Sequence, residues 1–470
     1  MTAKLLTIFL AGACICAAED PTAELLSQLI KVNTSNPPGN EARLDELLAS
    51  KFGPLGFQVE IVPTPDAAKS HFIARLRGDG SKKPVLLAAH ADVVGVERDK
   101  WTVDPFAGVI KDGYVFGRGA IDFKGGIAVF AEAVMTLARN KVPLARDIIF
   151  LSEADEEGGK YNTTWLAQSH WPKIECEFAL NEGGWIIKNP DGKVRFVSIS
   201  TADKASVSLL LTAHGTSTHS SMPRPDNAIF LLSKAMARLA DYETQPKLIP
   251  STREFFLTLG KTSQPPMSGY FTDLASSSDP VRVKLADIEI SKDPLLHAIM
   301  RNTIAPVLMN AGFRGNVIPG SAEATINIRA IPGTDVRELI SEIQSVIHDP
   351  RVEVTLVTRA LPGGTETGSA QIERMKNSKP STEDTDLYRA LAEGSKSTWP
   401  EAAVTPYLFQ AGTDAGAWRM RGVPVYGIYP YPIDSDDLSR MHGNDERVSI
   451  ESLRQGTQMI YKTLVKVAAK

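Results

Sequence analysis

Cysteine is nearly absent from this chain, which has three in 470 residues, Cys14, Cys16 and Cys176. The first two lie in an N-terminal segment that we interpret below as an export signal, so Cys176 is left alone. A single cysteine cannot form an intrachain disulfide, and it cannot supply the cysteine clusters of structural zinc sites. We interpret Cys176 as a small, partly buried apolar residue; a thiol nucleophile is the alternative.

A strong charge of either sign is also missing. The 51 Lys and Arg residues oppose 55 Asp and Glu residues, which gives a net charge of −4. This balance offers no electrostatic basis for binding nucleic acid or an anionic membrane surface.

No apolar run reaches the ~20 residues that a membrane-spanning helix needs. The N-terminus instead combines a short start containing Lys4, an apolar run over residues 5–15, and small residues at 16–18. This order is typical of a cleaved signal peptide, and a short buried helix is the alternative. We therefore expect a signal over residues 1–18 and export to the periplasm or the extracellular space, without a membrane span.

Helix-like and strand-like segments alternate in the first part of the chain. Apolar residues at helical spacing predict helices, and short apolar runs predict buried strands. The predicted elements are helices 23–32 and 41–52, strand 84–89, helix 126–139, strand 147–151, helix 163–169 and strand 178–180. Alternation of this kind predicts an α/β fold, an open mixed sheet flanked by helices.

The pattern changes after about residue 205. The expected elements are strand 206–213, helix 227–240, an irregular stretch 263–279, helix 294–309, strand 322–329, helix 336–347 and strand 352–358. The last strand–helix–strand unit indicates an α+β module, and residues 361–385 have the composition of a linker. Strand 423–429 and helix 450–467 then return to the α/β pattern. We expect a catalytic domain of residues 19–202 and 361–470, with an inserted α+β sandwich domain at 203–360.

Histidine and carboxylate clusters follow three of the predicted strands. The clusters are His90-Ala-Asp92, Asp155-Glu156-Glu157 and Asn181-Glu182, joined by the glycine-rich loop 117–126 with Asp122 and by His442 before the last helix. Ligands in open α/β sheets bind beyond the carboxyl ends of the strands, so these groups should share one crevice. The loop 117–126 fits neither phosphate-binding glycine template. Histidine and carboxylate ligands without cysteine favour zinc or a similar divalent ion in a hydrolytic site.

Taken in order, these motifs resemble the metallopeptidase family of aminoacylase, acetylornithine deacetylase, glutamate carboxypeptidase and carboxypeptidase S. The resemblance runs from about residue 20 to residue 470. It rests on His90-Ala-Asp92-Val-Val, Trp101 with Asp104-Pro-Phe106, Gly117-Arg-Gly-Ala-Ile-Asp122-Phe-Lys124-Gly, Asp155-Glu-Glu157 and His442-Gly-Asn.

The resemblance implies two zinc ions per chain, for which cobalt or manganese could substitute. Asp122 would bridge the two ions. His90 and Glu182 would bind one ion, and Glu157 and His442 would bind the other.

Other residues acquire roles from the same resemblance. Glu156 would be the general base that takes a proton from the metal-bridging water, and Asp92 would orient the His90 imidazole through its second nitrogen. Of the remaining carboxylates in the stretch LSEADEEGG (151–159), we expect Glu153 to face solvent or pair locally and Asp155 to shape the turn.

The inserted domain carries residues that match positions near the substrate in the family. His219, in His214-Gly-Thr-Ser-Thr-His219, matches the histidine that reaches the active site of a partner subunit, which implies a homodimer formed through this domain. Asn316 and Arg329 match substrate-holding positions. Gly412 and Thr413, in the later part of the catalytic domain, resemble another loop beside the substrate.

We therefore expect a dinuclear zinc hydrolase that cleaves an amide or peptide bond next to a free carboxylate. Its substrate would be a small peptide or an N-acyl amino acid, with no nucleic-acid partner. A metallo-aminopeptidase is the alternative within the same class. A catalytically inactive binding protein of the same fold is an alternative from another class, and a thiol hydrolase using Cys176 is a third.

Overall fold

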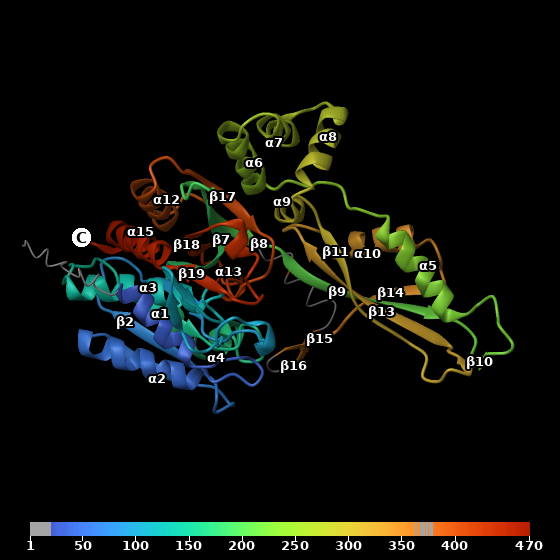
Figure 1. Cartoon of the computed structure of the whole chain (residues 1–470), viewed down its shortest axis with the longest axis horizontal. Helices are drawn as coiled ribbons and strands as arrows, with labels where there is room; N and C mark the ends of the chain where they lie inside the picture. Colours follow the sequence, from blue (N-terminus) through green and yellow to red (C-terminus); the bar gives the residue numbers. More distant parts are fainter. Residues whose placement is uncertain (1–19, 362–363, 367–371, 373–374, 376–378) are drawn as a thin grey trace, which may run out of the picture.

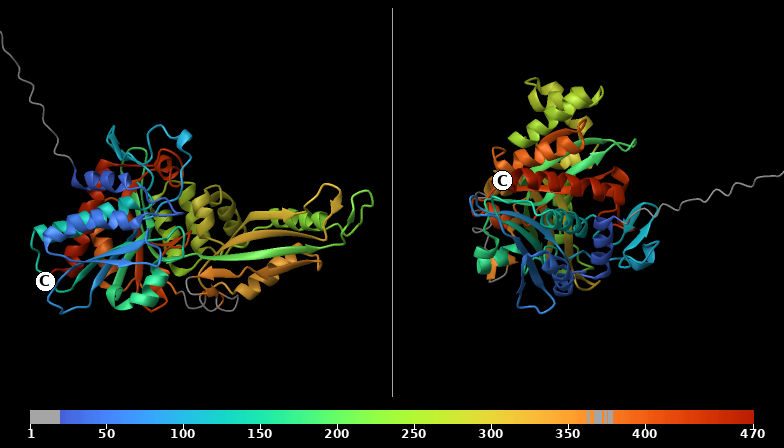
Figure 2. Two further views of the ribbon diagram at one scale, coloured as in Figure 1. Left: turned by 90° about the horizontal axis from the view of Figure 1, so that it is seen from below. Right: turned by 90° about the vertical axis from the view of Figure 1, so that its left-hand side faces the viewer.

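The computed structural model describes residues 20–361, 364–366, 372, 375 and 379–470. The expected signal at 1–18, with Cys14 and Cys16, lies outside the described residues. Across the described ranges, no helix combines the length and the apolar character needed to cross a bilayer. A large sheet with helices on both faces forms one part of the molecule, and a smaller sheet with its helices projects from it (Figures 1 and 2).

A mixed eight-stranded sheet forms the centre of the larger part, in the order β1-β2-β6-β3-β7-β18-β8-β17. The strands are β1 (Gln58–Pro63), β2 (Ser70–Leu76), β3 (Val85–His90), β6 (Ile148–Glu153), β7 (Phe178–Lys188), β8 (Val194–Asp203), β17 (Ala403–Phe409) and β18 (Val425–Ile433). Strands β6, β3, β7 and β18 are parallel, whereas β1, β2 and β8 introduce antiparallel pairs. The predicted fold class, an open mixed α/β sheet flanked by helices, is confirmed.

The apolar run of β3 is buried on both faces of this sheet. Leu87 and Ala89 belong to the core on one face, and Leu86 and Ala88 belong to the core on the other. Successive side chains of a strand point to opposite faces, so a strand covered on both sides is apolar throughout. The polar His90 follows only where the strand reaches the edge of the core.

Helices cover both faces of the large sheet. One face carries α1 (Pro21–Lys31), α2 (Glu41–Phe52), α3 (Lys124–Arg139), α12 (Asp386–Thr398) and α15 (Ile450–Ala468). The other face carries α4 (Thr163–Ile174) and the short α13 (Gly416–Arg419). Shorter elements are β4 (Val109–Lys111), β5 (Tyr114–Phe116), β19 (Arg447–Ser449), α14 (Ser435–Leu438), β15 (Arg359–Leu361), β16 (Gly364–Glu366) and the 3-10 turns Gly53–Leu55 and Arg98–Lys100.

The smaller part is a four-stranded antiparallel sheet in the order β11-β13-β9-β14. Its strands are β9 (Ala205–His214), β11 (Thr303–Ala311), β13 (Ser321–Ala330) and β14 (Val352–Leu356), and its helices are α5 (Ala228–Ala240) and α10 (Val336–Ile347). Alternate residues of β9, from Val207 to Ala213, are buried under these helices. This alternation is typical of a sheet covered on one face. A short antiparallel pair of strands, β10 (Thr218–His219) and β12 (Val317–Ile318), forms its tip.

Two predicted elements between residues 250 and 310 were wrong. The stretch 263–279, expected to be irregular, contains α7 (Met267–Ser276), which buries Phe271, Leu274 and Ala275 at helical spacing. The helix expected over 294–309 ends early: α9 spans Pro294–Ile299, and β11 follows. Pro306 would break a helix interior, but it is tolerated in β11 because that strand lies at the edge of its sheet.

The helical segment α6 (Pro250–Thr262), α7, α8 (Pro280–Ile290) and α9 shares the apolar core of the larger part. Phe255 of α6 packs edge-on against Tyr407 of β17, with ring centroids 5.1 Å apart. The sequence had placed residues 203–360 together in the inserted domain. Within residues 203–360, the segment α6–α9 packs on the large sheet through the aromatic residues of α6.

Candidate metal centre and active site

Five of the predicted ligand residues converge at one edge of the large sheet. His90 ends β3, Glu157 follows β6, and Glu182 lies in β7 just after its pairing with β3 ends at Leu180. Asp122 comes from the loop before α3, and His442 comes from the loop after α14. They form two groups, His90–Asp122–Glu182 and Asp122–Glu157–His442, and the ligand atoms within each group lie within 4.8 Å of one another.

The carboxylate of Asp122 is shared between the two groups. Its Oδ1 lies 3.1 Å from His90 Nε2, and its Oδ2 lies 2.9 Å from His442 Nε2. His90 Nε2 is 3.6 Å from Glu182 Oε2, and His442 Nε2 is 3.1 Å from Glu157 Oε1. Two ligands of a tetrahedral ion with bonds of ~2.1 Å are ~3.4 Å apart. These donor separations therefore suit two ions bridged by one carboxylate.

The carboxylates create a strong field for positive charge. Hydrogen bonds with Asp122 and Glu157 raise the pKa of His442 to about 10. Burial acts to lower the pKa of His90, but hydrogen bonds with Asp122 and Asp92 outweigh it, so this pKa is well above its ordinary value. A site that draws protons onto both imidazoles this strongly is one that favours a bound cation.

Asp92 contacts both His90 and the turn that carries the two glutamates. Its main-chain carbonyl oxygen lies 2.9 Å from His90 Nδ1, and its Oδ1 lies 3.7 Å from the same nitrogen. Its carboxylate accepts hydrogen bonds from the backbone amides of Glu156 and Glu157, each at 3.0 Å. Hydrogen bonding at Nδ1 leaves Nε2 of His90 for a metal ion.

Glu156 lies beside the ligand groups without belonging to either. Burial and the neighbouring carboxylate of Glu182 raise the pKa of Glu156 well above its ordinary value. A carboxylate with a raised pKa next to a metal centre is well placed to accept and return a proton.

Sequence reasoning missed Tyr429 of β18. Its hydroxyl lies 3.1 Å from Asp122 Oδ1 and 2.9 Å from Glu182 Oε2 and shares its one proton with these two acceptors, and its ring stacks on Trp185 with centroids 4.3 Å apart. The residue sits in an apolar strand that carries no motif. Only the pairing of β18 with β7 places it there.

The burial of Glu153 differs from the prediction. Glu153 was expected to face solvent or pair locally, but it is 1% exposed, because β6 is an interior strand and pairs Glu153 with His90 of β3. Burial, and then the charge of Asp414, raise the pKa of Glu153 well above its ordinary value.

Cys176 is buried in the core on the α4 face of the sheet. Burial raises the pKa of its thiol. Because the thiolate is the nucleophilic form, this environment argues against the thiol-hydrolase alternative.

A buried ion pair joins the loops that carry Asp122 and His442. Arg118 Nη1 lies 2.5 Å from Glu446 Oε2, and both side chains are almost fully buried. Glu446 also accepts hydrogen bonds from the backbone amides of Ile121 and Asp122, at 2.7 and 3.1 Å. Arg118 donates to the carbonyl oxygens of His442 and Gly443.

Replacing Arg118 by Met should therefore destabilise the protein, because Glu446 would be left buried without a counter-ion. Breaking one side of a buried pair costs about 3–5 kcal/mol. Arg98→Met is the matched control, since Arg98 forms an exposed pair with Asp104 worth less than about 1 kcal/mol. Urea unfolding followed by circular dichroism measures both variants. Equal shifts of the two midpoints would contradict the assignment.

The predicted substrate residues fall into two separate places. Arg329 and Gly412 lie together where the two sheets join, since a Cβ at Gly412 would be 3.7 Å from an Arg329 guanidinium nitrogen. Thr413 donates to Asp203 Oδ2 at 2.6 Å at the same junction. Asn316 and His219 instead lie at the tip of the smaller part, where the Asn316 carbonyl accepts from the amide of Ser220.

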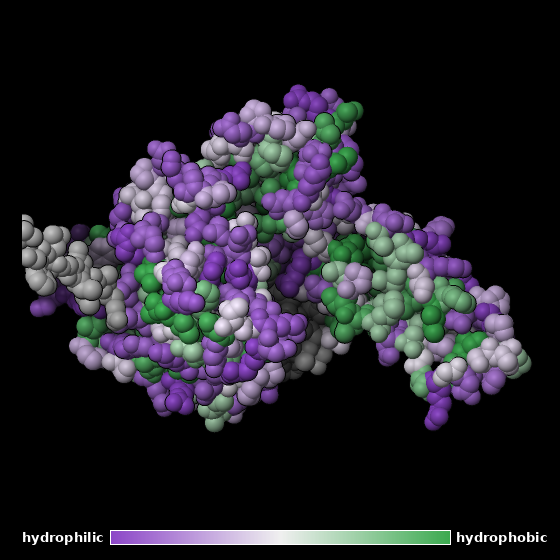
Figure 3. Space-filling view, viewed as in Figure 1, coloured by the Kyte–Doolittle hydropathy of each residue, from purple (hydrophilic) through white to green (hydrophobic). Residues whose placement is uncertain are grey.

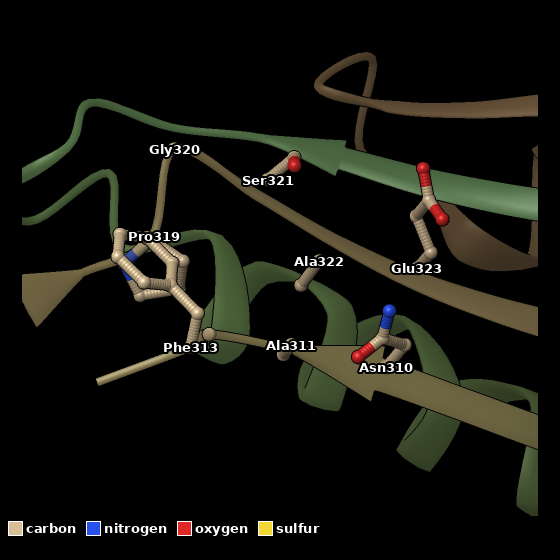
Figure 4. A pocket seen from close by; sticks show the side chains of 9 residues that line it. Asn310, Ala311, Phe313, Pro319, Gly320, Ser321, Ala322 and Glu323 are labelled. Atoms are coloured by element: carbon tan, nitrogen blue, oxygen red, sulfur yellow. The ribbon is translucent and has the colours of Figure 1, made fainter. Parts of the chain in front are cut away.

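The tip lies at the end of the smaller part that is farthest from the large sheet (Figures 1 and 2). Beside it, a depression of about 220 Å³ is lined by residues 310–313 and 319–323. Figure 4 shows this lining, in which Glu323 is the one titratable side chain. With no histidine and a single carboxylate, this depression lacks the ligands that the large sheet brings together.

Comparison with known proteins agrees with this geometry. The model of Peptidase family M20/M25/M40 matches residues 86–466. The probable carboxypeptidase S-like 2 of Dictyostelium discoideum is 31% identical over 390 residues, which cover 82% of this chain and 71% of that protein. The human N-fatty-acyl-amino acid synthase/hydrolase PM20D1 is 27% identical over 399 residues, which cover 84% and 76%.

Solved structures share the fold. The M20 family metallo-carboxypeptidase Sso-CP2 of Sulfolobus solfataricus superimposes with a TM-score of 0.66 at 16% identity, over 95% of this chain and 99% of that one. Human carnosine dipeptidase 1 gives a TM-score of 0.63 at 16% identity, over 95% and 96%. The family predicted from the motifs is confirmed. The chain belongs to peptidase family M20/M25/M40 and is a metal-dependent hydrolase of that family.

Proposed function

We propose that this chain hydrolyses an amide or peptide bond next to a free carboxylate, with two zinc ions and with Glu156 as general base. The observation that carries the proposal is the Asp122 carboxylate, which faces His90 with one oxygen and His442 with the other. The names of the relatives, a carboxypeptidase S-like protein and an N-fatty-acyl-amino acid synthase/hydrolase, support this bond type.

The donor set fits zinc. Each group offers one imidazole nitrogen and two carboxylate oxygens, and the shared Asp122 gives the bridge that a two-metal site requires. Cobalt or manganese could replace zinc in the same donor set. When bound, such ions polarise the substrate carbonyl and lower the pKa of a water molecule towards ~7.

The residues of the chain supply the proton transfers and the orientation. Glu156 takes a proton from the water molecule while the oxygen of that water bonds to the carbonyl carbon. It then returns this proton to the leaving nitrogen as the carbon–nitrogen bond breaks, which yields a carboxylic acid and an amine. Asp92 holds the amide of Glu156 and the imidazole of His90, so that base and ligand keep a fixed relation.

Arg329 is the proposed holder of the substrate carboxylate. A guanidinium group binds a carboxylate through two parallel hydrogen bonds, which would fix the scissile amide relative to the free carboxylate. Its place at the junction beside Gly412, with Thr413 bonded to Asp203, supports a substrate site between the two parts of the molecule.

Product analysis tests the substrate class. The purified protein, supplied with zinc or cobalt, is incubated with a mixture of N-acyl amino acids and dipeptides. We expect cleavage of N-blocked substrates with a free carboxylate and little cleavage of the same compounds as C-terminal amides. Cleavage that needs a free amino terminus and ignores the C-terminal block would favour the aminopeptidase alternative. No cleavage by a metal-loaded protein would favour a binding protein.

We also propose that the chain forms a homodimer through its smaller part. Strand β11 lies at the edge of the four-stranded sheet and exposes Leu308 and Met309 by 69% and 61%. Phe230 of α5 is 63% exposed, and apolar residues gather over α5 (Figure 3). An edge strand and an apolar helix face of this kind favour association with a second copy. The distance of His219 from its own metal centre supports a role in the partner's site.

Complementation tests both the dimer and His219. His219→Ala and Glu156→Gln should each be nearly inactive alone. After the two are mixed under conditions that exchange subunits, each heterodimer should contain one site with both native residues, so about a quarter of the sites become active. Light scattering gives the oligomeric state. Activity that does not recover in a mixture shown to contain heterodimers would contradict the role of His219.

A further inference from the structure

One histidine forms a hydrogen bond with each end of loop 154–161, which carries Glu156 and Glu157. His71, near the start of β2, accepts a hydrogen bond at Nδ1 from the amide of Ala154, at 3.2 Å. Its Nε2 lies 2.9 Å from the carbonyl oxygen of Tyr161 and donates to it. The ring is fully buried and stacks on Trp165. One neutral imidazole thus ties the first residue of loop 154–161 to its last.

Burial lowers the pKa of His71 to about 4. The imidazole is therefore neutral near pH 7, and it can accept at one nitrogen while it donates at the other.

A lysine two residues earlier binds Asp155, the second residue of the same loop. Lys69 Nζ forms a buried ion pair with the carboxylate of Asp155 and donates to Asn36 Oδ1 at 3.0 Å. Asp155 itself has a left-handed backbone, with φ 65°, and its Oδ2 accepts from the amides of Lys160 and Tyr161. A left-handed backbone is uncommon outside glycine, and aspartate is among the few residues that adopt it because its side chain can bond to nearby backbone groups.

Asn36 connects this ion pair to the catalytic turn. Its Nδ2 donates to Asp155 Oδ1 at 2.7 Å and to Asp92 Oδ2 at 2.8 Å. Asp92 in turn accepts from the amides of Glu156 and Glu157. The bonds therefore run without a break from Lys69 to the backbone of both glutamates.

The alternation of an extended segment accounts for this arrangement. Residues 69 and 71 point to the same side, towards the loop, whereas the Ser70 hydroxyl donates to Asp45 Oδ2 on the other side. No motif marked Lys69 or His71 in the sequence, and neither belongs to a ligand group.

We propose that Lys69 and His71 are positioning residues, which hold loop 154–161 in the conformation that presents Glu156 and Glu157 to the metal centre. The inference rests on the proposed function for the roles of those two glutamates. Residues that orient metal ligands from behind typically change activity or metal affinity by about 10–100-fold when they are replaced.

Hydrogen exchange of the metal-free protein tests the clamp without any use of activity. In Lys69→Met and His71→Leu, peptides covering 154–161 should exchange about tenfold faster or more. Lys69→Met removes the counter-ion of Asp155, which accepts from the amides of Lys160 and Tyr161, and His71→Leu removes the acceptor of the Ala154 amide. Lys160→Met and His170→Leu are the matched controls. Lys160 lies in the same loop, but its side chain is exposed. The ring of His170 contacts Trp165, as the ring of His71 does. Both controls should exchange like the wild type.

Steady-state kinetics then separate positioning from folding. We expect kcat to fall about 10–100-fold in both variants, with KM little changed, and Lys69→Arg should recover part of it because it keeps the charge. Unchanged kcat in Lys69→Met and His71→Leu, or an equal loss in the controls, would overturn the proposal.

A double variant keeps the test valid if Lys69→Met folds poorly. Adding Asp155→Asn removes the uncompensated buried charge, so the unfolding midpoint should return towards the wild-type value while kcat stays low. A kcat that returns together with the stability would overturn a positioning role. A different result, normal turnover of Glu156→Gln, would contradict the proposed function itself.

Discussion

Glu156→Gln should lower kcat by about 10²–10⁴-fold, the usual contribution of a positioned general base. The amide cannot take a proton from water, but it is the same size and keeps the backbone bond from Glu156 to Asp92. Because Glu156 belongs to neither ligand group, two metal ions per chain should remain, and KM should change little. Stopped assays with a cleaved N-acyl amino acid give kcat, and elemental analysis gives the metal content.

Glu153→Gln is the matched control for this prediction. Glu153 lies three residues earlier on the same segment and is buried, and burial holds its pKa well above the ordinary value. Glutamine has the same size, and Glu153 belongs to neither ligand group, so turnover should be close to wild type. Near-normal turnover of Glu156→Gln would remove Glu156 as the base. Loss of metal from that variant would make it a ligand instead.

Sequence motifs located the ligand residues because their chemistry is local. His90 ends an apolar run, and a run buried on both faces of an α/β sheet directs its last residue to the ligand-binding edge. Glu182 needed more than the local pattern. The predicted strand stopped at 180, whereas β7 continues to Lys188 and carries Glu182 two residues beyond the end of its pairing with β3 at Leu180.

Residues that act through long-range pairing could not be found this way. Tyr429 reaches the site because β18 pairs with β7, and it bonds to Glu182, 247 residues away in the chain. Lys69 reaches Asp155 across 86 residues, and Arg118 reaches Glu446 across 328. Periodicity in a window of residues carries no information on such pairs, and the burial of Glu153 was missed for the same reason.

Removal of metal should abolish turnover, and the structure indicates how the protein should respond. After dialysis against EDTA, the carboxylates of Asp122, Glu157 and Glu182 lie close together with the imidazoles of His90 and His442 as the cationic groups of the two clusters. Zinc should restore activity with a stoichiometry near two per chain and should raise the unfolding temperature, because an ion that binds only the folded state stabilises it. Magnesium is the matched control, since it prefers oxygen ligands and six-fold coordination.

His442→Ala should take up one zinc ion in place of two, because its other ligand group is intact. Full turnover of the metal-free protein would reject metal-dependent hydrolysis at this site, and saturation at one zinc ion with full activity would reject the bridging role of Asp122.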